Sequence, residues 1–324
     1  MISINRHAMR QVRTLMEQAE ALGCRYYRLG NGAHVIDMGI GVPGSWEAAR
    51  IFTEIDMASL GRCAYRDFPL DEQVSVAAVE VYVDNLELAC MASQMAGLQL
   101  AGLQLASGEF SAIASGPARA LARAAGDTHI HLTEYRDSHH EAVLGVTAGS
   151  LPDEQFAAHA AEVCCVDPQH LYLLMHGYNC RVNAVQVSAR IVEQTLNQMM
   201  LCSFPLDQLL SARGYCAVAP PAPDELQAMG WINDCLLYGG KAVFQVRSAD
   251  EVIAEKIPLL VTEHAADYGR PFLELFEEAG RDFYAMDLAI HSPAMVQIIN
   301  VASGSVFTAG SIRRDILKRN FFNL

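Results

Sequence analysis

The chain has 324 residues, of which 52% are apolar and 19% charged, as expected for a globular protein of about two domains. No apolar run approaches the ~20 residues of a membrane-spanning helix, and the amphipathic N-terminus lacks the apolar core of a secretory signal. A formal net charge of −14 argues against a nucleic-acid partner, because binding phosphates requires clustered Lys and Arg. We therefore expect a cytoplasmic protein that acts on neither membranes nor nucleic acid.

Short β-rich runs alternate with helical stretches along the chain. Strands are predicted at 33–40, 74–84, 141–149, 171–177, 241–250 and 255–262, and helices at 45–61, 85–100, 151–166 and 185–199. In the first of these helices, Ser45 is the expected cap and Gly61 the expected stop. The alternation predicts an α/β protein with two lobes of mixed sheet and helices and a cleft between them. We place an approximate boundary near residue 170, giving lobes of 1–170 and 171–324, although the chain can cross between lobes more than once.

The segment "ASGPARALARAAG" (114–126) has the composition of a loop that leads into a helix. Ser115 can cap the helix, Gly116 allows close backbone approach, and Pro117 suits the first turn. Exposed N–H groups at such a start, with Arg119 nearby, would form an anion site. The alternative is an ordinary loop-to-helix junction.

Two kinds of metal ligand occur in the sequence. Nine cysteines include no C-x-x-C pair, so reduced thiols are expected rather than a structural zinc site. The segment "HIHLTEYRDSHHE" (129–141) is rich in histidine, with His139, His140 and Glu141 adjacent. Its spacing matches no standard zinc helix, and its polarity is that of a solvated turn. We therefore assign no metal.

The predicted helix "VQVSARIVEQTLNQM" (185–199) carries a charged pair, Arg190 and Glu193, three residues apart. Its core-facing stripe consists of Val185, Ala189, Val192, Leu196 and Met199. The charged pair flanks this stripe and is close enough to touch. One interpretation is a half-exposed ion pair on a surface helix, which contributes little to stability. The other is a carboxylate at the rim of a cleft, oriented by the arginine.

An ordered set of segments resembles the methenyltetrahydromethanopterin cyclohydrolase family over nearly the whole chain. These segments are "NGAHVIDMG", "GSWEAAR", "LACMASQMAGLQL", "SGPARAL", "VQVSARIVEQTL", "FPLDQLL", "PPAPDELQAMG", "NDCLLYGG", "DYGRPFLELF", "DFYAMD" and "SPAMV". The resemblance implies opening of the cationic methenyl bridge of a tetrahydromethanopterin-type pterin to the formyl form, without metal or redox cofactor. It also implies a homo-oligomer, a trimer or a dimer.

The resemblance identifies Arg190 and Glu193 as the catalytic pair of an "AR-x-x-E" helix. Water must attack an amidinium-like carbon, so a carboxylate beside that carbon can stabilise the cation and accept the proton of water. Substrate-binding candidates are Ser115, Gly116, Pro117, Arg119, Asn183, Asn233 and Asp234. For Asn233 and Asp234, simple turn chemistry is the alternative.

The sequence departs from the family pattern at three places that concern binding. Val182 and Asn183 stand where small residues are usual, Trp231 and Ile232 where the family has Arg and Thr, and Ala285 where it has Lys. Two cationic side chains that would hold a polyanionic substrate are thus lost. Two alternatives therefore stay open: a paralogue that acts elsewhere on the same carrier, for example in its biosynthesis, and a pterin-binding protein without turnover.

Overall fold

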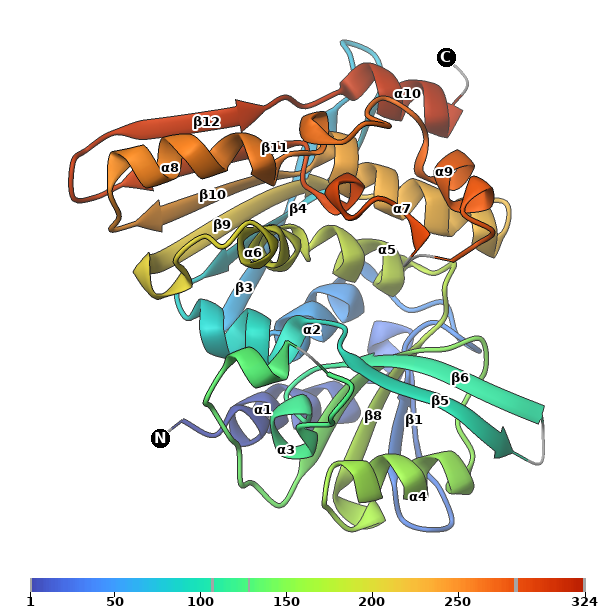
Figure 1. The fold of residues 1–324 in the computed structure, drawn as a ribbon. Coiled ribbons are helices and arrows are strands. Elements are labelled where there is room, and N and C mark those ends of the chain that lie inside the picture. The colour runs from blue at the N-terminus through green and yellow to red at the C-terminus, as the bar shows by residue number, and fades with distance from the viewer. Residues whose placement is uncertain (1, 106–107, 128, 283–284, 323–324) are drawn as a thin grey trace. The chain divides into compact units, whose positions relative to one another are not determined.

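The structure is a computed structural model that describes residues 2–105, 108–127, 129–282 and 285–322 (Figure 1). The chain divides into two compact units. Unit 1 comprises Met1–Arg62 and Glu87–Gln186, and unit 2 comprises Cys63–Leu86 and Val187–Leu324. The chain thus enters unit 2 at two points, residues 63 and 187, whereas we placed one approximate boundary near residue 170. Each unit contains a sheet and helices, which confirms the α/β class.

Unit 1 is built on a six-stranded mixed sheet in the order β1-β2-β8-β7-β6-β5. The strands are β1 (Arg25–Arg28), β2 (His34–Asp37), β5 (Leu98–Leu105), β6 (Gly108–Ser115), β7 (Ala142–Thr147) and β8 (Leu171–His176). The central strands β2, β8 and β7 are parallel, and the outer pairs are antiparallel. Buried central strands of this kind read as continuous apolar runs, which is why the sequence predicted β2, β7 and β8.

Helices cover both faces of the unit 1 sheet. They are α1 (Ile4–Glu17), α2 (Trp46–Asp56), the π-helix η2 (Glu87–Gln94), α3 (Arg119–Ala122), α4 (Glu154–Val163) and α5 (Arg181–Ser188), with short turns η1 (Glu20–Leu22), η3 (Ile130–Leu132) and η4 (Pro168–His170). Helix α4 packs on Leu171, Leu173 and Met175 of β8. The ring of Phe52 from α2 meets His176 of the same strand, and these two sets alternate along β8, so they face opposite sides.

Unit 2 contains the second six-stranded sheet, in the order β12-β11-β10-β9-β4-β3. Its strands are β3 (Gly61–Pro69), β4 (Ser75–Val83), β9 (Leu209–Ala217), β10 (Lys241–Val246), β11 (Met295–Asn300) and β12 (Val306–Gly310). Its helices are α6 (Ile191–Leu201), α7 (Glu225–Gly239), α8 (Asp250–Lys256), α9 (Phe272–Glu278) and α10 (Arg314–Phe322), with turns η5 (Leu206–Gln208), η6 (Ile257–Leu260), η7 (Thr262–His264) and η9 (Leu288–His291). Helices α6 and α7 pack on β9, as Figure 1 shows.

The structure corrects four of the predicted elements. Helix α2 ends at Asp56, so Gly61 is not its stop but the first residue of β3. The stretch 255–262 is not a strand: it forms the end of α8 and the turn η6, with Pro258 near the start of that turn. The predicted helix 85–100 ends with the π-helix at Gln94, and the chain joins β5 at Leu98. The predicted helix 185–199 is broken into α5 and α6. The predicted cap Ser45 is confirmed, because its hydroxyl accepts the N–H of Ala48 at 3.1 Å.

Candidate active site

The break between α5 and α6 falls at the charged pair. Arg190 is the N-cap residue of α6, with φ −75° and ψ 2°, and Glu193 lies in the first turn of that helix. The backbone N–H of Arg190 closes the end of α5 by bonding to Val187 O at 3.0 Å, and its carbonyl starts α6 by accepting from Gln194 at 2.7 Å. The catalytic candidates therefore sit at a helix start rather than in mid-helix.

The stripe residues predicted to face the core are all buried, including Val192 on α6. The pair itself is also largely buried, with side-chain exposures of 12% for Arg190 and 14% for Glu193. The interpretation as a half-exposed surface ion pair is therefore wrong. Guanidinium Nη1 and carboxylate Oε2 lie 3.8 Å apart, which is a charge contact rather than a tight bidentate bond. The Glu193 carboxylate interacts favourably with two positive groups, the guanidinium of Arg190 and the N-terminal end of the α6 dipole.

The start of α6 is seated on the sheet of unit 2 by two glycines. A Cβ atom at Gly214 of β9 would overlap Cγ2 of Ile191 and lie 2.9 Å from Cγ2 of Val81. A Cβ atom at Gly240 would overlap Cδ1 of the same Ile191. Only glycine allows this close approach. The position of the first turn of α6, and with it that of Glu193, therefore depends on contacts with residues far along the chain.

Replacing Gly214 by Ala is expected to destabilise the protein by about 1–3 kcal/mol, because the added methyl group overpacks the site against Ile191. The free energy of unfolding in urea measures this effect. Gly126→Ala is the control, since nothing lies within 4 Å of a Cβ atom at Gly126. Equal stability of the two variants would contradict the account of how α6 is seated.

The segment that begins at Ser115 does not form the predicted anion site. Ser115 ends β6 and its hydroxyl donates to Asp56 Oδ1 at 2.7 Å, so it caps no helix. Gly116 has φ +98°, a conformation that favours glycine. Pro117 lies before a helix of four residues, α3, which has no side-chain cap.

Arg119 is fully buried and has its charge satisfied inside unit 1. Its Nε and Nη2 donate to the two carboxylate oxygens of Asp127 at 2.6 and 2.7 Å. Nη1 donates to the carbonyls of Met91 and Ser93 at 2.9 and 3.2 Å. This guanidinium thus joins the start of α3 and the loop after α3 to the π-helix, and it presents no surface to solvent.

Asn183, on α5, is 3% exposed and bonds within its own segment. Its Nδ2 donates to Tyr178 O at 2.7 Å, and its Oδ1 accepts from Gln186 Nε2 at 2.9 Å. The neighbouring Val182 is buried, and its Cγ2 would lie 3.4 Å from a Cβ atom at Gly44. The two residues that depart from the small-residue pattern of the family therefore fill space in unit 1.

Asn233 and Asp234 lie on α7, not in a turn. Asn233 is partly buried and donates from Nδ2 to Met229 O at 2.9 Å. Asp234 is 1% exposed and accepts from the Phe272 N–H at 2.8 Å and from Asn320 Nδ2 at 2.9 Å. It thereby ties together α7, α9 and α10. Burial raises the pKa of Asp234 to about 7, against the two hydrogen bonds, which lower it.

This shift makes the stability of the protein depend on pH in a defined direction. Between about pH 4 and pH 7 the folded state holds the Asp234 proton more tightly than the unfolded state, so stability falls as pH rises. Asp234→Asn removes this contribution, and Asn320 can reverse its amide to keep the contact. We expect the stability of the variant relative to the unmodified chain to rise across this range by at most roughly 4 kcal/mol. Urea unfolding at pH 4.5 and about pH 7.5 tests it, and a constant difference would contradict it.

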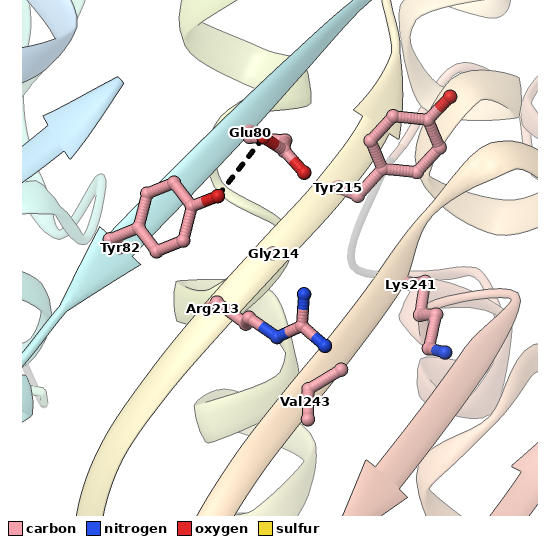
Figure 2. A pocket seen from close by; sticks show the side chains of 7 residues that line it. All are labelled: Glu80, Tyr82, Arg213, Gly214, Tyr215, Lys241 and Val243. Carbon is pink, nitrogen blue, oxygen red and sulfur yellow. Dashed lines mark hydrogen bonds between the residues drawn. The ribbon is translucent and has the colours of Figure 1, made fainter. Parts of the chain in front are cut away.

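A pocket that the sequence analysis missed lies on the sheet of unit 2 (Figure 2). It is lined by Glu80, Tyr82, Arg213, Gly214, Tyr215, Lys241 and Val243. The side chains of β4, β9 and β10 in this pocket alternate with buried ones such as Val81, which pack toward the helices. The Tyr82 hydroxyl donates to Glu80 at 3.0 Å, and the cations are Arg213 and Lys241. Residues two apart on a strand face the same side, so the spacing of Glu80 with Tyr82 and of Arg213 with Tyr215 could have indicated this surface. It was not recognised because β9 had not been predicted.

No described helix is long and apolar enough to cross a membrane.

Comparison with known proteins agrees with the resemblance noted from the sequence. Residues 3–321 match the family model described as cyclohydrolase (MCH). Proteins named methenyltetrahydromethanopterin cyclohydrolase are similar to this chain in Methanocaldococcus jannaschii, at 32% identity, and in Methanococcus maripaludis, at 34%. Each alignment covers 99% of this chain and 98% of the relative. The relative from Methanothermobacter marburgensis is 33% identical over 99% of both chains. The chain therefore belongs to the methenyltetrahydromethanopterin cyclohydrolase family.

Proposed function

We propose that this protein hydrolyses the methenyl bridge of methenyltetrahydromethanopterin to give formyltetrahydromethanopterin. The observation that carries the proposal is the Arg190–Glu193 pair, largely buried at the start of α6, in a chain that belongs to this family over almost its full length. A carboxylate held near an arginine at a helix start is suited to a cationic substrate that must be attacked by water.

In this mechanism Glu193 accepts a proton from water as the oxygen forms a bond to the cationic methenyl carbon. The positive charge of the amidinium is neutralised, and a tetrahedral adduct results. One carbon–nitrogen bond then breaks, and the leaving nitrogen takes the proton that Glu193 returns. The hydroxyl group of the adduct loses its own proton to solvent as it becomes the formyl oxygen, so the reaction releases one proton overall. Arg190, 3.8 Å from the carboxylate, orients it through the cycle. The proposal requires neither a metal nor a redox cofactor.

The substrate-binding candidates fall into two groups: buried ones whose polar groups already bond within the protein, and a partly buried one that we retain as a contact to the pterin. Arg119 and Asp234 are buried and bonded within units 1 and 2 respectively, so we assign each a structural role in its own unit. The same applies to Asn183, whose amide bonds within α5 and the preceding loop. Gly116 is also buried, and its N–H and carbonyl are bonded to Ser93 and Arg119. We retain the partly buried Asn233 as a candidate contact to the pterin.

Turnover and product identity test the proposal. The purified protein is mixed with methenyltetrahydromethanopterin, loss of the methenyl chromophore is followed optically, and the product is identified by mass. Catalysed decay to the formyl compound is the expected result. Binding of the pterin with decay no faster than in buffer would indicate a pterin-binding protein, and a different product would indicate a paralogue acting elsewhere on the carrier.

We further propose that the protein is a homo-oligomer, a trimer or a dimer, located in the cytoplasm. The support for this is its membership of the family. Light scattering on the purified protein determines the number of copies.

A further inference from the structure

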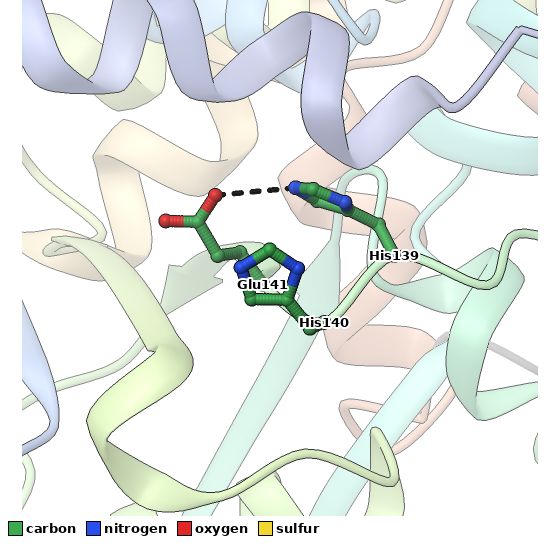
Figure 3. Close-up of side chains that lie close together, drawn as sticks. All are labelled: His139, His140 and Glu141. Carbon is green, nitrogen blue, oxygen red and sulfur yellow. Dashed lines mark hydrogen bonds and ion pairs between the residues drawn. The ribbon is translucent and has the colours of Figure 1, made fainter.

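Three imidazoles and a carboxylate come together in unit 1, outside the residues used by the proposed reaction. His139, His140 and Glu141 end the loop that leads into β7, and their candidate ligand atoms all lie within 4.8 Å of one another (Figure 3). His170, at the end of η4, approaches from a different element, with its ring centroid 5.4 Å from that of His140. Sequence spacing does not place His170 in this group, because His170 lies 30 residues beyond His140 along the chain.

The spacing of these groups suits one bound metal ion. His139 Nε2 and Glu141 Oε2 are 3.1 Å apart, close to the separation of about 3.3 Å between two ligands of a tetrahedral ion at 2.0–2.1 Å. Two imidazoles that share such an ion have ring centroids about 5 Å apart, by the same bond lengths. The centroid distances here are 4.5 Å for His139–His140 and 5.4 Å for His140–His170. His170 is not among the residues whose ligand atoms all lie within 4.8 Å of one another, so its half-exposed ring must turn to reach the ion. The ring of the exposed His140 is able to turn in the same way.

The carboxylate in this group is held in position from its other side. Arg13 Nη2 donates to both oxygens of Glu141, at 3.0 and 2.9 Å, and the Tyr172 hydroxyl donates to Oε1 at 3.2 Å. Metal sites commonly fix their ligands by such outer hydrogen bonds. Arg13 is the adverse charge for a cation, but its side chain is 59% exposed and remains solvated.

We propose that His139, His140 and Glu141 bind a divalent transition-metal ion of the Zn²⁺ class, with His170 as the fourth ligand. Imidazole nitrogens with one carboxylate oxygen favour such borderline ions over Mg²⁺ or Ca²⁺, which prefer all-oxygen sites. The ion would take the place of the direct contact between His139 and Glu141 and would tie the loop before β7 to η4.

Calorimetric titration of the metal-stripped, untagged protein with Zn²⁺ tests this proposal. We expect one saturable ion per chain that Mg²⁺ does not displace, and an affinity at least about tenfold lower in His140→Ala and in His170→Ala. Both variants remove partly or fully exposed side chains, and circular dichroism verifies that they fold. His159→Ala, a substitution in α4, is the matched control and should bind as the unmodified chain does.

Two outcomes would overturn the proposal. One is the absence of saturable binding, or an affinity unchanged by removal of His140 and of His170. The other concerns the exposed thiol of Cys165, since thiolates also bind zinc. If Cys165→Ala abolishes binding and the histidine variants do not, the ion lies at the thiol and the histidine site is excluded.

Discussion

Replacing Glu193 by Gln is expected to lower the turnover number for methenyltetrahydromethanopterin by about 10²–10⁴-fold, the usual contribution of a positioned base. The amide has nearly the same shape as the carboxylate, so the side chain can still occupy its position, with its 14% exposure, at the start of α6. It cannot accept the proton of water, and it no longer offers a negative charge to the cationic carbon. The effect is measured by following loss of the methenyl chromophore in stopped-flow or steady-state kinetics.

The control for this variant is Glu225→Gln. Glu225 also lies in the first turn of a helix of unit 2, α7, but it is exposed and has no role in the proposed reaction. We expect it to retain full turnover. If Glu193→Gln keeps the turnover of the unmodified chain, Glu193 is not the base and the charged pair serves only to hold the start of α6.

Prediction from sequence succeeded where one short range of residues determines the outcome. Ser45 caps α2 because its hydroxyl needs only the N–H of Ala48, three residues on. The prediction of a strand at 255–262 was wrong because a short apolar stretch is equally consistent with a strand and with a buried helical turn. Pro258 was the local feature that favoured the turn. The strand β9 was missed because Gly214, Ser211 and Arg213 interrupt its apolar pattern.

The candidate site shows the same division. The spacing of Arg190 and Glu193 placed the two charges within reach of each other, and the structure has them 3.8 Å apart. The helix break at Ala189 and Arg190 was not visible in the sequence. The residue that follows it, Ile191, packs against Gly214 and Gly240, which lie 23 and 49 residues further along the chain. In the sequence, such a contact is indicated only by a glycine, and a single glycine is compatible with many local structures.

The prediction that was furthest from the structure concerned the exposure of Arg119. A cation near a glycine-rich helix start suggested an anion site, yet the same cation is fully buried with Asp127 only eight residues away. The sequence held both partners, but nothing local specified that the intervening loop folds back to bring them together. The reach of the guanidinium to Met91 and Ser93 is likewise a tertiary contact.

Replacing Asp127 by Asn is expected to destabilise the protein by about 3–5 kcal/mol, the usual cost of removing one partner of a buried ion pair. The two side chains are 0% and 1% exposed, so the buried Arg119 charge would lose its counter-charge and keep only neutral acceptors such as the carbonyls of Met91 and Ser93. The amide would also turn an N–H group toward a guanidinium that can only donate. Urea unfolding followed by circular dichroism measures the loss, which should fall in the transition of unit 1 if the two units unfold separately.

The matched control is Glu47→Gln, which breaks a pair of the same form on the surface of unit 1. Arg50 Nε and Nη2 donate to the two oxygens of Glu47 at 2.9 and 2.6 Å, much as Arg119 does to Asp127, but the Glu47 side chain is 52% exposed. The introduced glutamine would face water, and Arg50 would keep its ion pair with Glu54 at 2.9 Å, so no charge is left buried without a counter-charge. We therefore expect a loss of about 1 kcal/mol or less. A similar loss in both variants would mean that hydrogen-bond geometry, rather than burial of the Arg119 charge, determines the cost.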